Sequence, residues 1–129
     1  MAKTVIQRVR FKATPAALYR LYMDPEQHGA AGGSAVQLDP KVGGRFVAFG
    51  MLKGRFLLLE PDRLIVQTWR STSWKQSDPD SILMLTFTKM PGGAEISLVH
   101  VRIPDHDYRG VQHGWPTYYW GPWKKYLAR

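Results

Sequence analysis

The chain contains no cysteine among its 129 residues. Disulfide frameworks, zinc ribbons and thiol nucleophiles are therefore excluded. Long hydrophobic runs are also missing: the longest apolar run near the middle is FLLL at 56–59, whereas a membrane-spanning helix needs about 20 residues. The first twelve residues, MAKTVIQRVRFK, hold no apolar stretch of the signal-peptide kind. We therefore expect a cytoplasmic protein with no membrane partner.

Runs of like charge are absent as well, although the chain is strongly basic. The formal net charge is +8 and the isoelectric point is about 10.0, which suits nucleic acid, an acidic partner or an anionic surface. The basic residues are dispersed, so there is no basic arm. No signature of an RNA-binding sheet is present, and most aromatics share a face with apolar residues, which indicates core rather than base stacking. We expect no nucleic-acid partner.

The motifs of common catalytic and cofactor sites are missing too. The glycine-rich stretch at 29–34 matches neither the dinucleotide-binding nor the P-loop spacing, and no serine lies in a GxSxG context. The acids and histidine at 105–107, with His113 nearby, match no standard ligand spacing and are interpreted as helix-capping acids and an exposed histidine. Asp78 and Asp80 are interpreted as surface carboxylates of a turn. The sequence predicts no catalytic residue, no metal and no cofactor.

What the chain does contain is enough apolar material for a core. Hydrophobic residues make up 44% of the sequence, and a chain of this length buries roughly two-thirds of its unfolded surface. No repeat, low-complexity tract or linker divides it. We therefore expect one domain over residues 1–129.

The N-terminal third predicts a strand and two short helices. In residues 4–12 apolar and basic side chains alternate, as in a half-buried strand; the apolar face holds Val5, Val9 and Phe11, and the basic face holds Arg8, Arg10 and Lys12. Thr14-Pro15 is an N-cap followed by proline, which predicts a helix to about Met23. Asp24-Pro25 repeats that signal, and residues 29–34 end the second helix.

Short β-rich segments separated by turns occupy the middle of the chain. Turns of this length join antiparallel neighbours, so the pattern predicts a meander and an α+β protein. The six expected strands are residues 34–38, 45–50, 54–60, 63–71, 81–90 and 94–103.

The C-terminal stretch predicts one aromatic helix. At helical spacing one set of side chains falls within an arc of about 100°, namely Trp115, Tyr119, Pro122, Trp123 and Tyr126. Thr117, Lys124 and Ala128 lie on the opposite side, with Trp120 and Tyr118 beside the arc. The two prolines, at 116 and 122, predict a kink near residues 112–118.

Several segments taken in order resemble the family of activator of heat-shock-protein-90 ATPase homologues, a branch of the START-like (SRPBCC, Bet v 1-like) superfamily. They are FKATPAALYRLYMDPEQH (11–28), VGGRF (42–46), IVQTWRSTSW (65–74), the strand at 81–87, GAEISLVH (93–100), the dipeptide IP (103–104) and GWPTYYWGPWKKYL (114–127). The resemblance covers nearly the whole chain. It implies a helix-grip fold of order β-α-α-β6-α, in which a curved antiparallel sheet wraps around a long C-terminal helix.

The resemblance also implies a pocket between helix and sheet. In that layout one set of side chains faces Trp115 and Tyr119 across the cavity, with Trp74 and Tyr22 near its mouth. The set is Phe46, Phe56, Leu58, Trp69, Leu85 and His100. The alternation around His100 places this histidine on the inward face of its strand independently of the resemblance.

Three hypotheses for function follow. The first is a non-catalytic protein that binds a small apolar or aromatic ligand in this pocket, unless the aromatic side chains simply fill the core. The second is a co-chaperone or other interaction module with an acidic partner, suggested by Arg8, Arg10 and Lys12. The third is an enzyme on a bulky apolar substrate with His100 or a tyrosine as acid or base.

Overall fold

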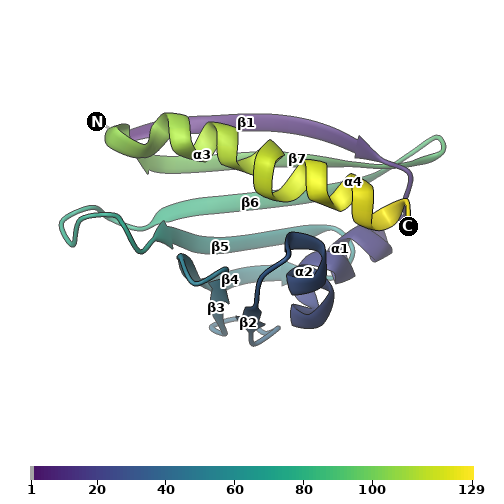
Figure 1. Cartoon of the computed structure of the whole chain (residues 1–129), viewed down its shortest axis with the longest axis horizontal. Helices are drawn as coiled ribbons and strands as arrows, with labels where there is room; N and C mark the ends of the chain where they lie inside the picture. The colour runs from purple at the N-terminus through teal and green to yellow at the C-terminus, as the bar shows by residue number, and fades with distance from the viewer. Residues whose placement is uncertain (1) are drawn as a thin grey trace.

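The computed structural model describes residues 2–129, which form one curved sheet crossed by a C-terminal helix (Figure 1). The sheet has seven strands in the order β1-β7-β6-β5-β4-β3-β2, and all neighbours are antiparallel. The strands are β1 (Ala2–Phe11), β2 (Val36–Leu38), β3 (Arg45–Ala48), β4 (Leu52–Glu60), β5 (Leu64–Ser71), β6 (Ser81–Met90) and β7 (Gly93–Pro104). The predicted α+β helix-grip fold is confirmed.

Two short helices, α1 (Pro15–Met23) and α2 (Pro25–Gly32), follow β1 as the sequence predicts. The hydroxyl of Thr14 accepts a hydrogen bond from the Ala17 amide at 3.1 Å, and the Asp24 carboxylate accepts one from the Glu26 amide at 3.0 Å. Each side chain thus satisfies one of the free amides at a helix start. Gly33 ends α2 in the left-handed conformation, at φ 76°.

One residue in β4 disturbs the expected alternation. Phe56 pairs with Gln67 but Leu58 pairs with Val66, so Leu57 is an extra residue, a β-bulge. Beyond the bulge every side chain changes face. The expectation that Leu58 faces the cavity is therefore wrong: its side chain is 48% exposed on the outer face, and Leu59 packs against the core instead.

The C-terminal helix consists of η1 (Asp105–Asp107), α3 (Tyr108–Gly114), a π-helical segment η2 (Trp115–Trp120) and α4 (Gly121–Leu127). The disturbance expected from the prolines takes the form of this π segment, in which the Gly121 amide donates to the Pro116 carbonyl five residues earlier. The wider turn shifts the aromatic face. Trp120, expected beside the aromatic arc, is as buried as Trp115 and stacks on it with ring centroids 5.4 Å apart.

A glutamine in β1 supports the helix where proline interrupts it. Pro116 has no amide hydrogen for the carbonyl of Gln112. The side-chain amide of Gln7 donates to that carbonyl at 2.9 Å, and its oxygen accepts from the indole of Trp120 at 2.8 Å. Gln7 therefore joins β1 to two places on the helix. Nothing in the sequence pattern singles it out.

Candidate functional site

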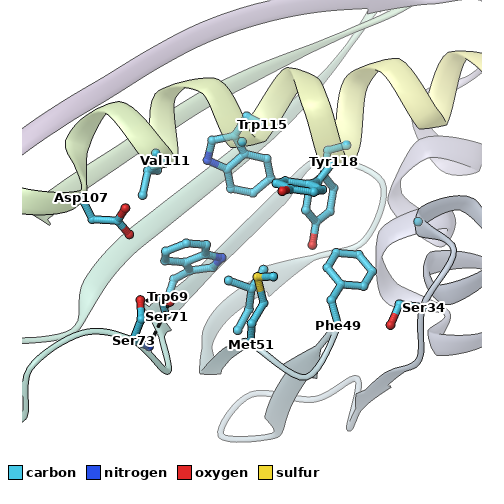
Figure 2. Close-up of a pocket in the computed structure, with 15 residues that line it drawn as sticks. Ser34, Phe49, Met51, Trp69, Ser71, Ser73, Asp107, Val111, Trp115 and Tyr118 are labelled. Carbon is cyan, nitrogen blue, oxygen red and sulfur yellow. Dashed lines mark hydrogen bonds between the residues drawn. The ribbon is translucent and has the colours of Figure 1, made fainter.

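A pocket of about 450 Å³ lies between the C-terminal helix and one end of the sheet (Figure 2). Its walls come from the helix, from the hairpin that joins β3 to β4, and from β5. The space is of the size that proteins use for small organic ligands, which is roughly 300–1,000 Å³.

The helix side of the pocket carries both bulky side chains and glycines. Val111 and Trp115 are spaced by four residues and face the pocket, and so do Gly110 and Gly114. Gly114 has ordinary right-handed helical angles, and a Cβ there would meet only the Tyr118 ring, at 3.6 Å. Its backbone therefore does not require glycine. What glycine supplies at this position is space.

The hairpin side carries Phe49, Met51 and Leu52. Phe49 has φ 58°, which is unusual for a bulky residue and costs about 1–3 kcal/mol. Its ring lies against Gly32, where a Cβ would come within 2.6 Å, and its centroid is 5.7 Å from that of Tyr119. Packing against α2 and the helix thus holds the strained turn, and with it one lip of the pocket.

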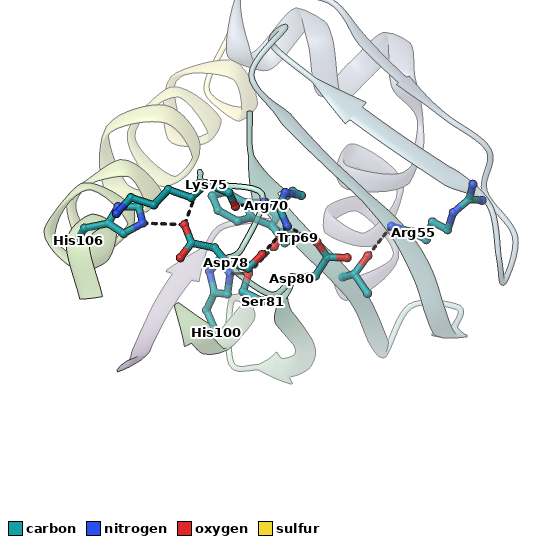
Figure 3. A network of polar contacts seen from close by, with 10 residues as sticks. Arg55, Trp69, Arg70, Lys75, Asp78, Asp80, Ser81, His100 and His106 are labelled. Atoms are coloured by element: carbon teal, nitrogen blue, oxygen red, sulfur yellow. Dashed lines mark hydrogen bonds and ion pairs between the residues drawn. The ribbon is translucent and has the colours of Figure 1, made fainter. Parts of the chain in front are cut away.

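Beneath the pocket, both ring nitrogens of His100 are hydrogen-bonded, and Figure 3 shows this ring beside Ser81. The Ser81 hydroxyl donates to the Trp69 carbonyl at 2.6 Å, so it accepts from His100 Nε2 at 2.8 Å. His100 Nδ1 accepts from the Trp115 indole at 3.2 Å. The ring is therefore the neutral Nε2–H tautomer, and burial lowers its pKa to about 3. Neither nitrogen is free to act on a ligand.

A second buried histidine, His28, supports the other end of the aromatic wall. Its Nδ1 lies 2.8 Å from the Tyr22 carbonyl, which can only accept, so Nδ1 carries the hydrogen. Its Nε2 accepts from the Tyr119 hydroxyl at 2.9 Å. Burial lowers the pKa of His28 to about 4 and raises the pKa values of Tyr22 and Tyr119. The sequence analysis missed His28, which lies in a short helix of small and polar residues without an apolar face.

The ten residues expected to line the pocket separate into three groups. Trp69, Trp115 and Tyr119 do line it. Behind that wall, in the core, lie Tyr22, Phe46, Phe56, Leu85 and His100, and Trp74 packs on the far side of Trp69 with ring centroids 5.5 Å apart. Leu58 lies outside. Tyr22, expected near the mouth, is fully buried and donates to Gln67.

The hairpin residues and Tyr118 are pocket residues that sequence reasoning missed. Tyr118 was expected beside the aromatic arc, and in the structure it forms the lip opposite Phe49 and is 56% exposed. Phe49 and Met51 lie at the end of an expected strand and in the following turn. In the sequence only Gly50 could have indicated a sharp reversal there, because glycine readily adopts the positive φ that the structure has at this position.

Polar residues of η1, of the end of β5 and of the loop between β5 and β6 form ion pairs and hydrogen bonds. The side chain of Asp107 makes no cap to α3, contrary to expectation, and accepts from the Trp74 indole at 2.7 Å. Arg70 binds Asp80 at 2.8 Å, and His106 donates to Asp78 and holds the pKa of that carboxyl below its ordinary value (Figure 3).

Among residues 2–129 no group of three acids or histidines could hold a metal ion. In the same range no helix is long and apolar enough to span a membrane.

Comparisons with known proteins identify relatives over most of the chain. The family model described as "Activator of Hsp90 ATPase homolog 1-like protein" matches residues 12–128. The human protein "Activator of 90 kDa heat shock protein ATPase homolog 1" is 31% identical over 84% of this chain and 32% of its own length. An uncharacterised protein of Schizosaccharomyces pombe is 31% identical over 93% of this chain and 36% of its own length. The chain thus spans about a third of these curated relatives.

Solved structures share the fold at lower identity. An HSP90 activator from Plasmodium falciparum superimposes with a TM-score of 0.85 over 99% of this chain and 96% of its own, at 22% identity. A Mesorhizobium loti protein gives 0.84 over 98% of each chain at 23% identity. On the family match and the relatives together, the chain belongs to the activator of Hsp90 ATPase homolog 1-like family.

Proposed function

We propose that this protein binds a small, apolar or aromatic molecule in the pocket between the C-terminal helix and the sheet, without catalysis. The observation that carries the proposal is the pocket of about 450 Å³ walled by Trp69, Trp115, Tyr118, Tyr119 and Phe49. Aromatic walls provide large apolar contact area with few rotatable bonds. Such a wall with few polar groups is the usual form of a small-molecule site.

The polar network beneath the wall supports binding rather than reaction. A general base needs a free nitrogen or oxygen within reach of the substrate, and both nitrogens of His100 are engaged with Ser81 and Trp115. The nitrogens of His28 are engaged in the same way. The third hypothesis of the sequence analysis, an enzyme with His100 as acid or base, therefore loses its main residue.

The proposal is tested with N-phenyl-1-naphthylamine, a neutral apolar dye whose fluorescence rises in apolar sites. We expect saturable binding with one dye per chain. Gly114→Leu places a side chain in the pocket at a backbone position that accepts one, so we expect binding at least tenfold weaker. Thr117→Leu adds the same side chain on the exposed side of the helix and should bind as the original protein does. Unsaturable binding, or equal binding by Gly114→Leu, would refute the proposal.

A second candidate function, binding of a chaperone partner, is supported by the outer face of the sheet. Strand register places Ile6 beside Val99, Val99 beside Met84, Met84 beside Val66, and Val66 beside Leu58. These five side chains form an apolar row across five strands. Ile6 and Leu58, at its ends, are 68% and 48% exposed.

Basic side chains lie beside both ends of this row. Arg8 follows Ile6 on the same face of β1, and Arg55 and Lys53 precede the bulge of β4; all three are exposed. An apolar centre with a charged rim is the usual composition of a protein interface, and the positive rim suits an acidic partner. Because relatives are named as activators of the 90 kDa heat shock protein, we propose that protein as the partner.

Binding to the purified 90 kDa heat shock protein tests the second candidate. We expect the affinity to fall steeply between 50 and 300 mM salt. We also expect Leu58→Glu to lower this affinity at least tenfold. Val42→Glu changes an exposed apolar residue outside the row and serves as the control. Binding that is indifferent to Leu58→Glu would place the interface elsewhere.

A further inference from the structure

We infer that the ligand of the pocket is a neutral molecule that carries a hydrogen-bond acceptor, such as a ketone or ether oxygen, and that the indole N–H of Trp69 binds this acceptor. The inference rests on the proposed function of the pocket. It adds the chemical class of the ligand and the residue that selects it.

Trp69 combines burial with a donor that has no protein partner. Its side chain is only 6% exposed and lines the pocket. Among residues 2–129, its Nε1 is the buried side-chain nitrogen or oxygen that makes no hydrogen bond. Figure 2 shows this nitrogen on the edge of the ring nearer Met51. Three other indoles donate to protein acceptors: those of Trp74, Trp115 and Trp120.

The acceptors around Trp69 have other partners, and none of them accepts from its indole. Both nitrogens of His100 are engaged, although its ring centroid is 4.7 Å from that of Trp69. The hydroxyl oxygens of Ser71 and Ser73 lie 2.8 Å apart and bind each other. An unsatisfied buried donor costs about 1–3 kcal/mol, and proteins leave few of them. An acceptor on a ligand would remove this cost, whereas a pure hydrocarbon would keep it.

The nitrogen itself is covered by neighbouring atoms, so an acceptor reaches it when a wall side chain moves. Met51 is suited to that movement because it is 44% exposed and unbranched, and methionine adapts readily to irregular space. It lies on the hairpin that forms the lip of the pocket.

The charge of the wall favours a neutral ligand over an anionic one. Asp107 is the carboxylate in the wall, and no lysine, arginine or histidine among the described residues lines the pocket. A fatty acid or other carboxylate would meet like charge and find no cation. The acceptor is therefore an uncharged oxygen, and the rest of the molecule is apolar.

Two probes of nearly equal shape separate the acceptor from the apolar body. 9-Fluorenone has a carbonyl where fluorene has a methylene group. Their affinities are measured by displacement of N-phenyl-1-naphthylamine, for the original protein and for Trp69→Phe, which keeps an aromatic ring but lacks the N–H. Dividing the fluorenone-to-fluorene affinity ratio of one protein by that of the other cancels the different hydration of the two probes.

We expect this ratio to fall about tenfold in Trp69→Phe, the change that corresponds to one buried hydrogen bond. Trp120→Phe also removes an indole N–H but lies outside the pocket, and its ratio should not change. In the original protein the carbonyl stretch of bound fluorenone should shift to lower wavenumber than in a hydrocarbon solvent, a readout that does not depend on any variant folding.

An unchanged ratio in Trp69→Phe, or an unshifted carbonyl stretch, would overturn the inference while leaving an apolar pocket in place. If neither probe displaces the dye and the dye itself does not bind, the proposed function fails, and this inference fails with it. The two failures are thus distinguishable.

Discussion

At the scale of single residues, His28 and His100 hold neutral rings in opposite tautomers inside the core. Their folded pKa values, about 4 and about 3, lie below the ordinary 6.5 of the unfolded chain. The unfolded chain therefore binds protons that the folded chain does not. The stability from these groups is complete above about pH 6.5 and is lost as the pH falls toward the folded values.

The difference between folded and unfolded pKa values predicts that each histidine costs the protein about 1 kcal/mol of unfolding free energy when the pH falls from 7 to 5.5. Urea denaturation at the two pH values measures it. His28→Asn keeps a donor near the Tyr22 carbonyl but cannot titrate, so its loss should be about half that of the original protein. Stability that is equal at pH 7 and pH 5.5 would contradict the assignment of both rings as neutral and buried.

The N–H groups of Trp69 and Trp115, both in the pocket wall, should contribute differently to the free energy of unfolding. In Trp115→Phe, His100 Nδ1 loses its donor and becomes a buried unsatisfied acceptor. In Trp69→Phe the lost N–H has no protein partner. Both side chains are buried to a similar degree, so the loss of packing is similar. We expect Trp115→Phe to be less stable than Trp69→Phe by about 1–3 kcal/mol in urea denaturation. The reverse order would mean that Trp69 Nε1 is satisfied.

At the scale of secondary-structure elements, the bulge in β4 decides which leucine faces the core. Leu58→Lys should change the unfolding free energy by less than about 0.5 kcal/mol, because the side chain is already half exposed. Leu59→Lys should cost about 1–3 kcal/mol, because Leu59 packs against the core. If the two costs are exchanged, β4 has no bulge and regular alternation extends through it.

The π segment gives a second prediction at this scale. Gln7→Leu removes the donor to the Gln112 carbonyl and the acceptor for the Trp120 indole. We expect a loss of about 1–3 kcal/mol, mainly because the Trp120 indole becomes unsatisfied in a partly buried place, whereas the Gln112 carbonyl is exposed to water. Thermal or urea unfolding measures it. Arg8→Leu, on the opposite, exposed face of the same strand, should cost little. A neutral effect of Gln7→Leu would mean that water replaces Gln7.

Most elements could be predicted from the sequence because local rules operate in them. The caps at Thr14 and Asp24 and the alternation around His100 in β7 depend only on neighbouring residues, and both predictions are confirmed. The bulge at Leu57 and the π segment each add one residue to a regular period. A pattern read with a fixed period assigns the wrong face beyond such an insertion, as happened for Leu58, and it left Trp120 at the edge of the aromatic arc although this residue is buried.

At the scale of the whole molecule, the pocket depends on contacts between segments far apart in the sequence. The wall unites Phe49, Trp69 and Trp115, which come from a hairpin, a strand and a helix. The helical spacing placed Trp115 on the aromatic face of the helix, and the family resemblance implied that Trp69 faces it. The sequence could not indicate the hairpin members or His28, because their positions depend on how α2 packs against Tyr119 and Phe49.

The two proposed activities use opposite faces of one sheet. The pocket lies between the helix and the inner face, while the apolar row from Ile6 to Leu58 crosses the outer face. Variants in one should leave the other intact: Gly114→Leu should still bind the chaperone, and Leu58→Glu should still bind the dye.

The central claim, an apolar site between helix and sheet, is tested most directly by the five tryptophan indole N–H signals in a ¹⁵N-correlated NMR spectrum, titrated with N-phenyl-1-naphthylamine. We predict that the signals of Trp69 and Trp115, which line the pocket, shift and saturate at one dye per chain. Those of Trp120 and Trp123, which do not line it, should stay nearly unchanged. Saturation that leaves the Trp69 and Trp115 signals in place would contradict the account.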